Sequence, residues 1–166
     1  MPGKNLTKNI NVQAWNKFRR TFDSVVKCEE SSFAKVGLPP QQFYVLSAIK
    51  LIHPPVTSTD VARWLDRNPN TITLIIDRMQ KDGLVNRARN LKDRRACSLT
   101  ITEKGQEMYE KALKPAGKLP GTVFSALSPE ELTEFTTLLD KICENTYQMR
   151  NIKTKPGETS KISEKQ

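Results

Sequence analysis

The segment 57–83, TSTDVARWLDRNPNTITLIIDRMQKDG, constrains the fold more than any other part of the chain, because it holds two short helical patterns separated by a tight turn. Thr57 and Asp60 have the spacing of a capping box, which predicts that a first helix opens into VARWLD. The turn at residues 67–69 leads into a second helix that Gly83 ends. Two short helices joined in this way form a helix-turn-helix unit.

Apolar residues recur on one side of each helix, and we expect those sides to face a common core. The predicted inward residues are Val61, Trp64 and Leu65 in the first helix and Ile72, Ile75, Ile76 and Met79 in the second. Two β-prone runs follow at residues 84–89 and 97–102, and the polar segment 90–96 between them is long enough for a hairpin loop. The sequence therefore predicts a β-wing behind the helix-turn-helix.

Helices are predicted on both sides of this winged unit, so the expected fold class is mainly α with a small β-wing. An apolar stripe from about residue 9 to 35 predicts a long helix that needs a partner, and a shorter helix covers about 41–52. Thr102 caps a further helix, which we expect Pro115 and Pro120 to interrupt or kink. Ser128 and Glu131 form a second capping box, which opens the last helix.

This pattern predicts one domain at residues 9–149, with the winged helix-turn-helix at about 40–102 and flanking helices at about 9–35 and 103–149. We expect a flexible N-terminus at 1–8 and a disordered basic tail at 150–166, which has almost no large apolar residues to bury. No apolar run approaches the ~20 residues that span a bilayer, and the N-terminus lacks the apolar stretch of a signal peptide. We therefore expect a cytoplasmic protein without membrane association.

Positive charge is concentrated in and around the predicted wing. The formal net charge is +9, and residues 78–95 carry seven Lys and Arg against two Asp, so that this short segment supplies more than half of the excess. A strongly basic segment favours a polyanionic partner. Arg side chains at a hairpin tip are suited to the phosphate backbone and to a narrow minor groove.

The same sequence offers little for catalysis or metal binding. Cys28, Cys97 and Cys143 are far apart and form no C-x-x-C pair, so neither a zinc site nor a disulfide framework is indicated, and we expect no metal or cofactor. Cys97 and Cys143 are expected to be small packed side chains. His53 has no catalytic partner pattern around it, and there is no Gly-rich phosphate loop. We do not expect an enzyme.

Two strings, TSTDVARWLDRNPNTITLIIDRMQKDGLV and KDRRACSLTITEKG, resemble the multiple antibiotic resistance regulator (MarR) family of winged-helix transcription factors. The first ends in the family's D-R-x-x-x-x-G-L-V, and the second has its D-x-R followed by L-T-x-x-G. The resemblance covers roughly residues 12–149. It implies a homodimer whose first and last helices interlock and whose two winged lobes bind a pseudo-palindromic operator in duplex DNA.

The resemblance and the helical pattern together give candidate DNA contacts. On the second helix of the helix-turn-helix, the outward residues suited to base edges are Asn70, Thr71, Thr73, Leu74 and Arg78. For Asn70 and Thr71 the alternative is helix capping near Pro69. In the wing the candidates are Arg87, Arg89, Lys92, Arg94 and Arg95. Arg95 matches the family's wing arginine, whereas Asp93 is expected to brace a neighbouring arginine, Arg78 or Arg95.

Many members of this family have a small-molecule cleft between the dimerisation helices and the DNA-binding lobe. Candidates for its lining are Trp15, Phe18, Phe22, Tyr44 and His53, although aromatic residues at helical spacing also suit a core. We therefore expect a homodimeric repressor that a small ligand, such as an aromatic compound, releases from DNA. Two alternatives stay open. One is a thiol-based redox sensor, although Cys28 lies about three helical turns beyond the position that the hydroperoxide-sensing branch uses. The other is a winged-helix module that binds protein or RNA.

Overall fold

The computed structural model describes residues 9–89 and 97–150 of the 166-residue chain. The elements in this part are α2 (Ile10–Ala34), α3 (Pro40–Leu51), α4 (Ser58–Trp64), α5 (Pro69–Lys81), β1 (Val85–Arg89), β2 (Cys97–Ile101), α6 (Glu103–Val123) and α7 (Pro129–Met149). The two strands are antiparallel, with Val85 opposite Ile101 and Arg89 opposite Cys97. The predicted mainly helical fold with a small β-wing is confirmed.

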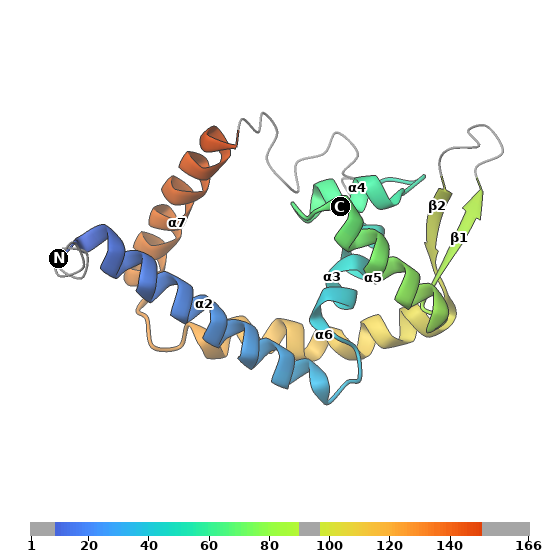
Figure 1. Cartoon of the computed structure of the whole chain (residues 1–166). Coiled ribbons are helices and arrows are strands. Elements are labelled where there is room, and N and C mark those ends of the chain that lie inside the picture. The colour runs from blue at the N-terminus through green and yellow to red at the C-terminus, as the bar shows by residue number, and fades with distance from the viewer. Residues whose placement is uncertain (1–8, 90–96, 151–166) are drawn as a thin grey trace, which may run out of the picture.

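The molecule has a compact lobe and an extended arm (Figure 1). The lobe consists of α3, α4, α5 and the hairpin, and the arm consists of α2, α7 and the distal part of α6. The lobe is built on an apolar core in which Leu46, Val61, Ile76 and Met79 are completely buried. Phe33 of α2 and Ala112 of α6 belong to the same core, so packing joins the lobe to α2 and to α6.

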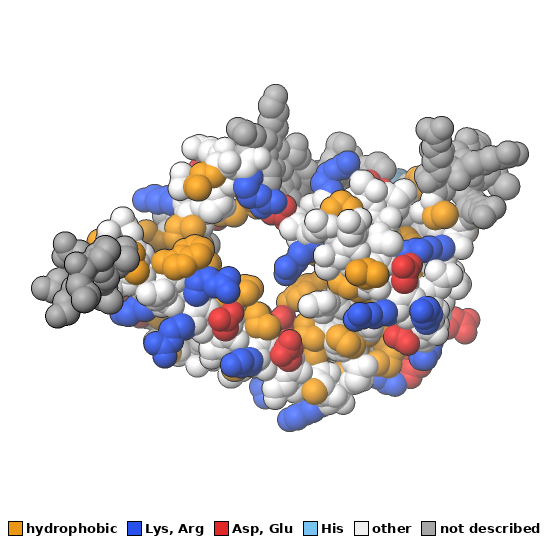
Figure 2. Space-filling model, in the orientation of Figure 1, with side chains coloured by type: hydrophobic (Ala, Val, Ile, Leu, Met, Phe, Trp, Pro, Cys, Tyr) orange, Lys and Arg blue, Asp and Glu red, His pale blue; other side chains and the backbone are white. Residues whose placement is uncertain are grey.

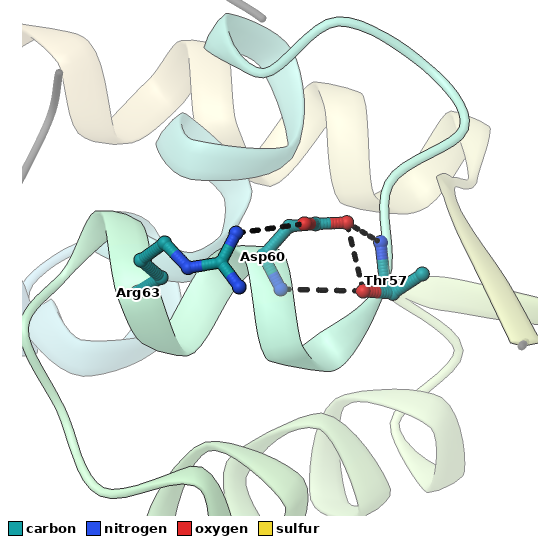
Figure 3. Close-up of polar contacts among 3 residues, drawn as sticks. All are labelled: Thr57, Asp60 and Arg63. Atoms are coloured by element: carbon teal, nitrogen blue, oxygen red, sulfur yellow. Dashed lines mark hydrogen bonds and ion pairs between the residues drawn. The ribbon is translucent and has the colours of Figure 1, made fainter. Parts of the chain in front are cut away.

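Helix α4 begins with the predicted capping box (Figure 3). The Asp60 amide donates to Oγ1 of Thr57 over 3.2 Å, and the Thr57 amide donates to Oδ2 of Asp60 over 3.0 Å. Arg63 adds an ion pair of 3.8 Å to the other Asp60 oxygen. The helix therefore starts where the sequence predicts.

The buried side of α4 differs in part from the prediction. Val61 is buried as expected, but the second buried residue is Ala62, while Trp64 and Leu65 are half-buried. The helix has only seven residues, and its last turn lies at the edge of the lobe, where two large side chains are only partly covered.

Helix α5 follows after a tight turn and ends as predicted. Asn68 is the N-cap, with its side chain accepting from the Asn70 amide over 2.9 Å, and Pro69 occupies the first helical position. Gly83 ends the segment at φ +70°, a left-handed conformation that glycine adopts without a Cβ clash. Of the predicted inward stripe, Ile72, Ile76 and Met79 are buried and Ile75 is half-buried.

Of the two outcomes expected for the prolines of α6, an interruption is wrong, and a kink stays a prediction. The helix runs through Pro115 and Pro120 without a break and ends at Val123. Each proline removes one intrahelical hydrogen bond, to the carbonyl of Lys111 or Ala116. Neither residue is buried, so water can reach the carbonyls that the prolines leave without a helical donor.

Helix α7 opens with the second predicted capping box, between Ser128 and Glu131. It rises from the distal end of α6 at a large angle to α2 and α6 (Figure 1), and an opening separates it from the lobe (Figure 2). Arg150, which the sequence analysis assigned to the tail, is the C-cap residue of α7, and residues 151–166 lie outside the described part. No helix in the described ranges is both long and apolar enough to cross a membrane.

The arm exposes large apolar side chains. None of the residues of α7 is buried, and in α2 only Phe33 is. Hydrophobic side chains gather over the N-terminal part of α2 and the adjoining α7 (Figure 2). The exposed residues are Ile10, Trp15, Phe18 and Phe22 of α2 and Leu132, Phe135, Leu138, Ile142 and Met149 of α7. A surface of this kind is typical of a protein interface.

Gly105 is expected to be indispensable where α6 meets the base of the hairpin. A Cβ at this position would lie 2.0 Å from the carbonyl oxygen of Leu84 and 2.9 Å from Cγ2 of Ile101. A Gly105→Ala substitution should therefore lower the free energy of unfolding by about 1–3 kcal/mol, the usual cost of overpacking. Gly117→Ala is the matched control on the same helix, because a Cβ there meets nothing within 4 Å. Urea denaturation of both variants tests this, and equal stabilities would contradict it.

Candidate nucleic-acid interface

The outer side of α5 presents a mixed polar and apolar surface. Asn70, Thr71, Leu74 and Arg78 are all exposed, and Leu74 leaves 61% of its surface in solvent. Thr73 is half-buried, and its hydroxyl donates to the Pro69 carbonyl over 2.9 Å. Since Asn68 is the N-cap, the capping role considered for Asn70 and Thr71 belongs to neither of them.

An ion pair fastens the wing to this helix. Nη1 of Arg87 on β1 lies 2.7 Å from Oδ1 of Asp77 on α5. Nothing in the sequence pattern of the helix identifies a partner for Asp77. The pair fixes the strand relative to α5, so that the helix and the base of the wing are presented as one unit. The DNA contact of Arg87 stays a prediction, and in the structure its guanidinium makes this bracing contact with Asp77.

A shallow hollow of about 330 Å³ lies between the start of α4, α5 and the hairpin. Hydroxyl-bearing side chains and one guanidinium dominate its lining, which includes Ser58, Thr59, Thr73 and Arg87. Hydroxyl groups and arginine are the usual protein donors to DNA phosphate oxygens. The hollow adjoins the exposed side of α5. Together they offer hydrogen-bond donors suited to DNA phosphates and side chains suited to base edges.

The tip of the wing lies outside the described residues. Arg89 is the last residue of β1, and Lys92, Asp93, Arg94 and Arg95 fall in the segment 90–96. Their DNA contacts and the bracing role of Asp93 therefore stay predictions from the sequence. Among the described residues, Asp77 pairs with a wing arginine, Arg87.

A cavity of about 550 Å³ lies where the C-terminal half of α2 meets the start of α3 and the turn before α5. Its walls include Val26, Phe33 and Leu38, with Glu29, Glu30 and Arg67 as the charged groups. Of the predicted pocket residues, only Tyr44 lines it. Trp15, Phe18 and Phe22 lie on the exposed side of α2, and His53 is exposed beyond the end of α3.

Tyr44 is held at the cavity wall by a hydrogen bond from its hydroxyl to Oε1 of Glu29. Burial and this bond to a carboxylate raise the pKa of Tyr44 to about 12, so the phenol is neutral at physiological pH. The sequence identified Tyr44 but missed Glu29, Glu30 and Arg67. Glu29 and Glu30 lie between Val26 and Phe33 along α2, and Arg67 comes from the turn before α5, so no local pattern groups them.

The prediction that Cys97 and Cys143 are packed side chains is wrong. Both are exposed free thiols, as is Cys28. Cys97 starts β2 at the loop end of the hairpin, opposite Arg89, and Cys143 lies on α7, which buries no residue in the single chain. Burial of small residues depends on which elements cover them, and the sequence pattern of one element does not contain that information.

Three comparisons relate this arrangement to known proteins. A sequence profile described as the MarR family matches residues 38–97, which contain α3, α4, α5 and β1. The transcriptional activatory protein BadR of Rhodopseudomonas palustris is 30% identical over 138 residues, which cover 80% of this chain and 74% of BadR. The HTH-type transcriptional repressor MdtR of Bacillus subtilis is 28% identical over 128 residues, which cover 76% of this chain and 82% of MdtR.

Among solved structures, the organohalide-sensing RdhR transcriptional regulator in its 2,4-dichlorophenol-bound form matches with a TM-score of 0.80. The match covers 96% of this chain and 92% of that regulator at 19% identity, which shows that the fold is shared. The sequence comparisons assign the chain to a family as well as to a fold, since the segment that matches the family profile contains the whole helix-turn-helix. The chain belongs to the MarR family of winged-helix, DNA-binding transcriptional regulators.

Proposed function

We propose that this protein is a homodimeric repressor that binds a pseudo-palindromic operator in duplex DNA and leaves it when a small ligand binds. The observation that carries the proposal is the outer side of α5, where exposed Leu74 lies among Asn70, Thr71 and Arg78. An exposed leucine is suited to a thymine methyl group and asparagine to adenine. The proposed target is chromosomal DNA, which places the action of the protein in the cytoplasm.

Selection of bound sequences from a random duplex pool tests the DNA-binding part of the proposal. We expect two half-sites in inverted orientation with centres about 10 bp apart or a multiple of it, because two symmetry-related helices reach successive major grooves. The same selection with single-stranded RNA is the control. Enrichment of RNA, or no enrichment of any duplex, would contradict an operator-binding function.

The exposed apolar side chains of the arm support the dimer. A second copy would cover the stripe on α2 and the stripe on α7, which a single chain leaves in solvent. Sedimentation at micromolar concentration should give a mass of about 38 kDa, twice the 18.9 kDa of one chain. A single species at the monomer mass would contradict the proposal that two lobes of a dimer bind the two half-sites of an operator.

Repression is the proposed direction of regulation. MdtR is named a repressor and BadR an activatory protein, so the relatives include both directions. Transcription in vitro from a promoter that contains the selected operator tests the sign, and we expect added protein to reduce the transcript. An increase would make the protein an activator on the same DNA site.

The cavity beside Tyr44 supports release by a small ligand. Its volume of about 550 Å³ is in the range of small-molecule sites, and it touches both the arm helix α2 and the turn before α5. An occupant that favours one spacing of the two lobes would shift the population away from the DNA-binding arrangement. The expected result is a ligand that weakens operator binding by the wild type and has a smaller effect on Tyr44→Trp, whose larger side chain narrows the cavity.

Arg95 is proposed to contact DNA from the wing tip. An Arg95→Ala variant should bind operator and scrambled duplexes more weakly, and the slope of log affinity against log salt should decrease by about one unit for each lost phosphate contact. Lys118→Ala is the control, because it removes an equal charge from the exposed side of α6. Titrations at several salt concentrations measure both slopes. An unchanged slope for Arg95→Ala would show that this side chain does not contact phosphate.

A further inference from the structure

The end of α7 makes a long-range contact with the DNA-binding lobe. Nη1 of Arg150 lies 2.6 Å from Oδ2 of Asp66, and Nη2 lies 2.8 Å from Oδ1. The two bonds are of the paired guanidinium–carboxylate kind, which fixes the relative orientation of the two groups as well as their distance. The residues are 84 positions apart in the chain, so the contact joins the last helix of the arm to the lobe.

Asp66 is well placed to transmit this contact to α5. It lies in the turn between α4 and α5 and adopts φ +47°, a left-handed conformation that aspartate tolerates better than most residues. The turn is tied to α4 by bonds from the amide of Asp66 to the Arg63 carbonyl and from the amide of Arg67 to the Ala62 carbonyl, of 3.2 and 2.9 Å. Helix α5 starts three residues later, at Pro69. A displacement of Asp66 would therefore displace the start of α5.

Other attachments between α7 and the lobe are sparse. Helix α7 buries no residue, and the ring contact that it makes, between Phe135 and Phe124, is with the turn that precedes it, 6.0 Å between centroids. Within residues 9–89 and 97–150, the pair with Asp66 is the hydrogen-bonded link between α7 and the lobe. Removing it would free the lobe from the end of the arm.

We propose that Arg150 and Asp66 are positioning residues for DNA recognition: their bidentate pair fastens the α4–α5 turn to the end of α7 and so fixes the orientation of α5 relative to the dimerisation arm. The inference rests on the proposed function, since orientation matters only if the two lobes must match two half-sites. The bonding to Arg150 lowers the pKa of Asp66, so the carboxylate is ionised at neutral pH and the pair is intact there. Because about half of the Arg150 side chain is in solvent, the pair contributes little to the free energy of unfolding. Its main effect is on the orientation of α5.

Two single variants and their combination test the positioning role. Asp66→Asn keeps the size of the side chain and tolerates the left-handed backbone, and Arg150→Gln removes the guanidinium. Each should weaken operator binding by about two- to fivefold, the effect of an ion pair with partly exposed groups, and the double variant should lose no more than either single one. Glu107→Gln is the matched control, because it removes an exposed pair with Lys111, of 2.6 Å, that lies within α6 alone.

Hydrogen exchange supplies a second measurement that does not need DNA. The amides of residues 65–70 should exchange several-fold faster in Asp66→Asn and in Arg150→Gln, and at the wild-type rate in Glu107→Gln. Unchanged exchange in the first two variants would overturn the inference, and so would faster exchange with wild-type operator affinity. A wild-type protein that selects no duplex would instead contradict the proposed function, and faster exchange in the variants would then still establish the link between the turn and α7.

Discussion

A Leu138→Asp variant is expected to sediment as a monomer of 18.9 kDa under conditions where the wild type forms the proposed dimer. Leu138 leaves 49% of its surface in solvent in the single chain, and Phe135 and Ile142 lie on the same side of α7. In a symmetric interface one substitution introduces two carboxylates, and each would be buried without a partner. The cost of an unpaired buried charge is on the order of 3–5 kcal/mol, which weakens dimerisation by a factor of about 100 or more.

The matched control for this experiment is Thr133→Asp, which introduces the same charge on the opposite side of α7. Thr133 is exposed, and its hydroxyl donates to the Pro129 carbonyl, so it takes no part in the apolar stripe. Circular dichroism should show that both variants stay folded, because α7 buries no side chain against the lobe. Operator binding should fall steeply for Leu138→Asp alone. Dissociation by both variants, or by neither, would show that this stripe is not the dimer interface.

Features set by neighbouring residues could be predicted from the sequence. Both capping boxes, at Thr57 and at Ser128, are formed as the spacing indicates, because a cap is a contact between a side chain and a backbone three residues away. Gly83 ends the helix-turn-helix for an equally local reason, its positive φ. The family strings depend on the same local signals, which is why the fold class was recognisable.

Features that join distant parts of the chain could not be predicted. The pairs Asp77–Arg87 and Asp66–Arg150 need a known spatial arrangement, and many other Asp and Arg residues were equally available to each partner. The lining of the cavity could not be predicted for the same reason, since Arg67 reaches it from a turn far along the chain from α2. The apolar stripe on α2 was identified correctly, but a pattern that requires a partner does not say whether the partner is the same chain or a second copy.

The last prediction concerns the residue that we expect to read bases. A Leu74→Ala variant should lose about 1–3 kcal/mol of binding free energy on the selected operator and almost none on scrambled duplex, because a contact with a base edge carries sequence information and a phosphate contact does not. Leu74 lies on the exposed side of α5 with 61% of its surface in solvent, so its truncation leaves the core of the lobe unchanged. A Thr73→Ala substitution should lower the operator affinity less, since the Thr73 hydroxyl already donates a hydrogen bond to the Pro69 carbonyl.

A thymine-to-deoxyuridine series of the operator identifies the contact, because deoxyuridine lacks only the C5 methyl group. At the position that Leu74 reads, the methyl deletion should weaken the wild type but not Leu74→Ala, which gives a non-zero coupling energy in a double-mutant cycle. Leu113→Ala is the matched control, since it truncates another leucine, 45% exposed, on α6 outside α5 and the wing. If Leu74→Ala loses operator and scrambled binding in equal proportion and couples to none of the thymines, then α5 supports the interface without reading it, and sequence selection must come from the wing.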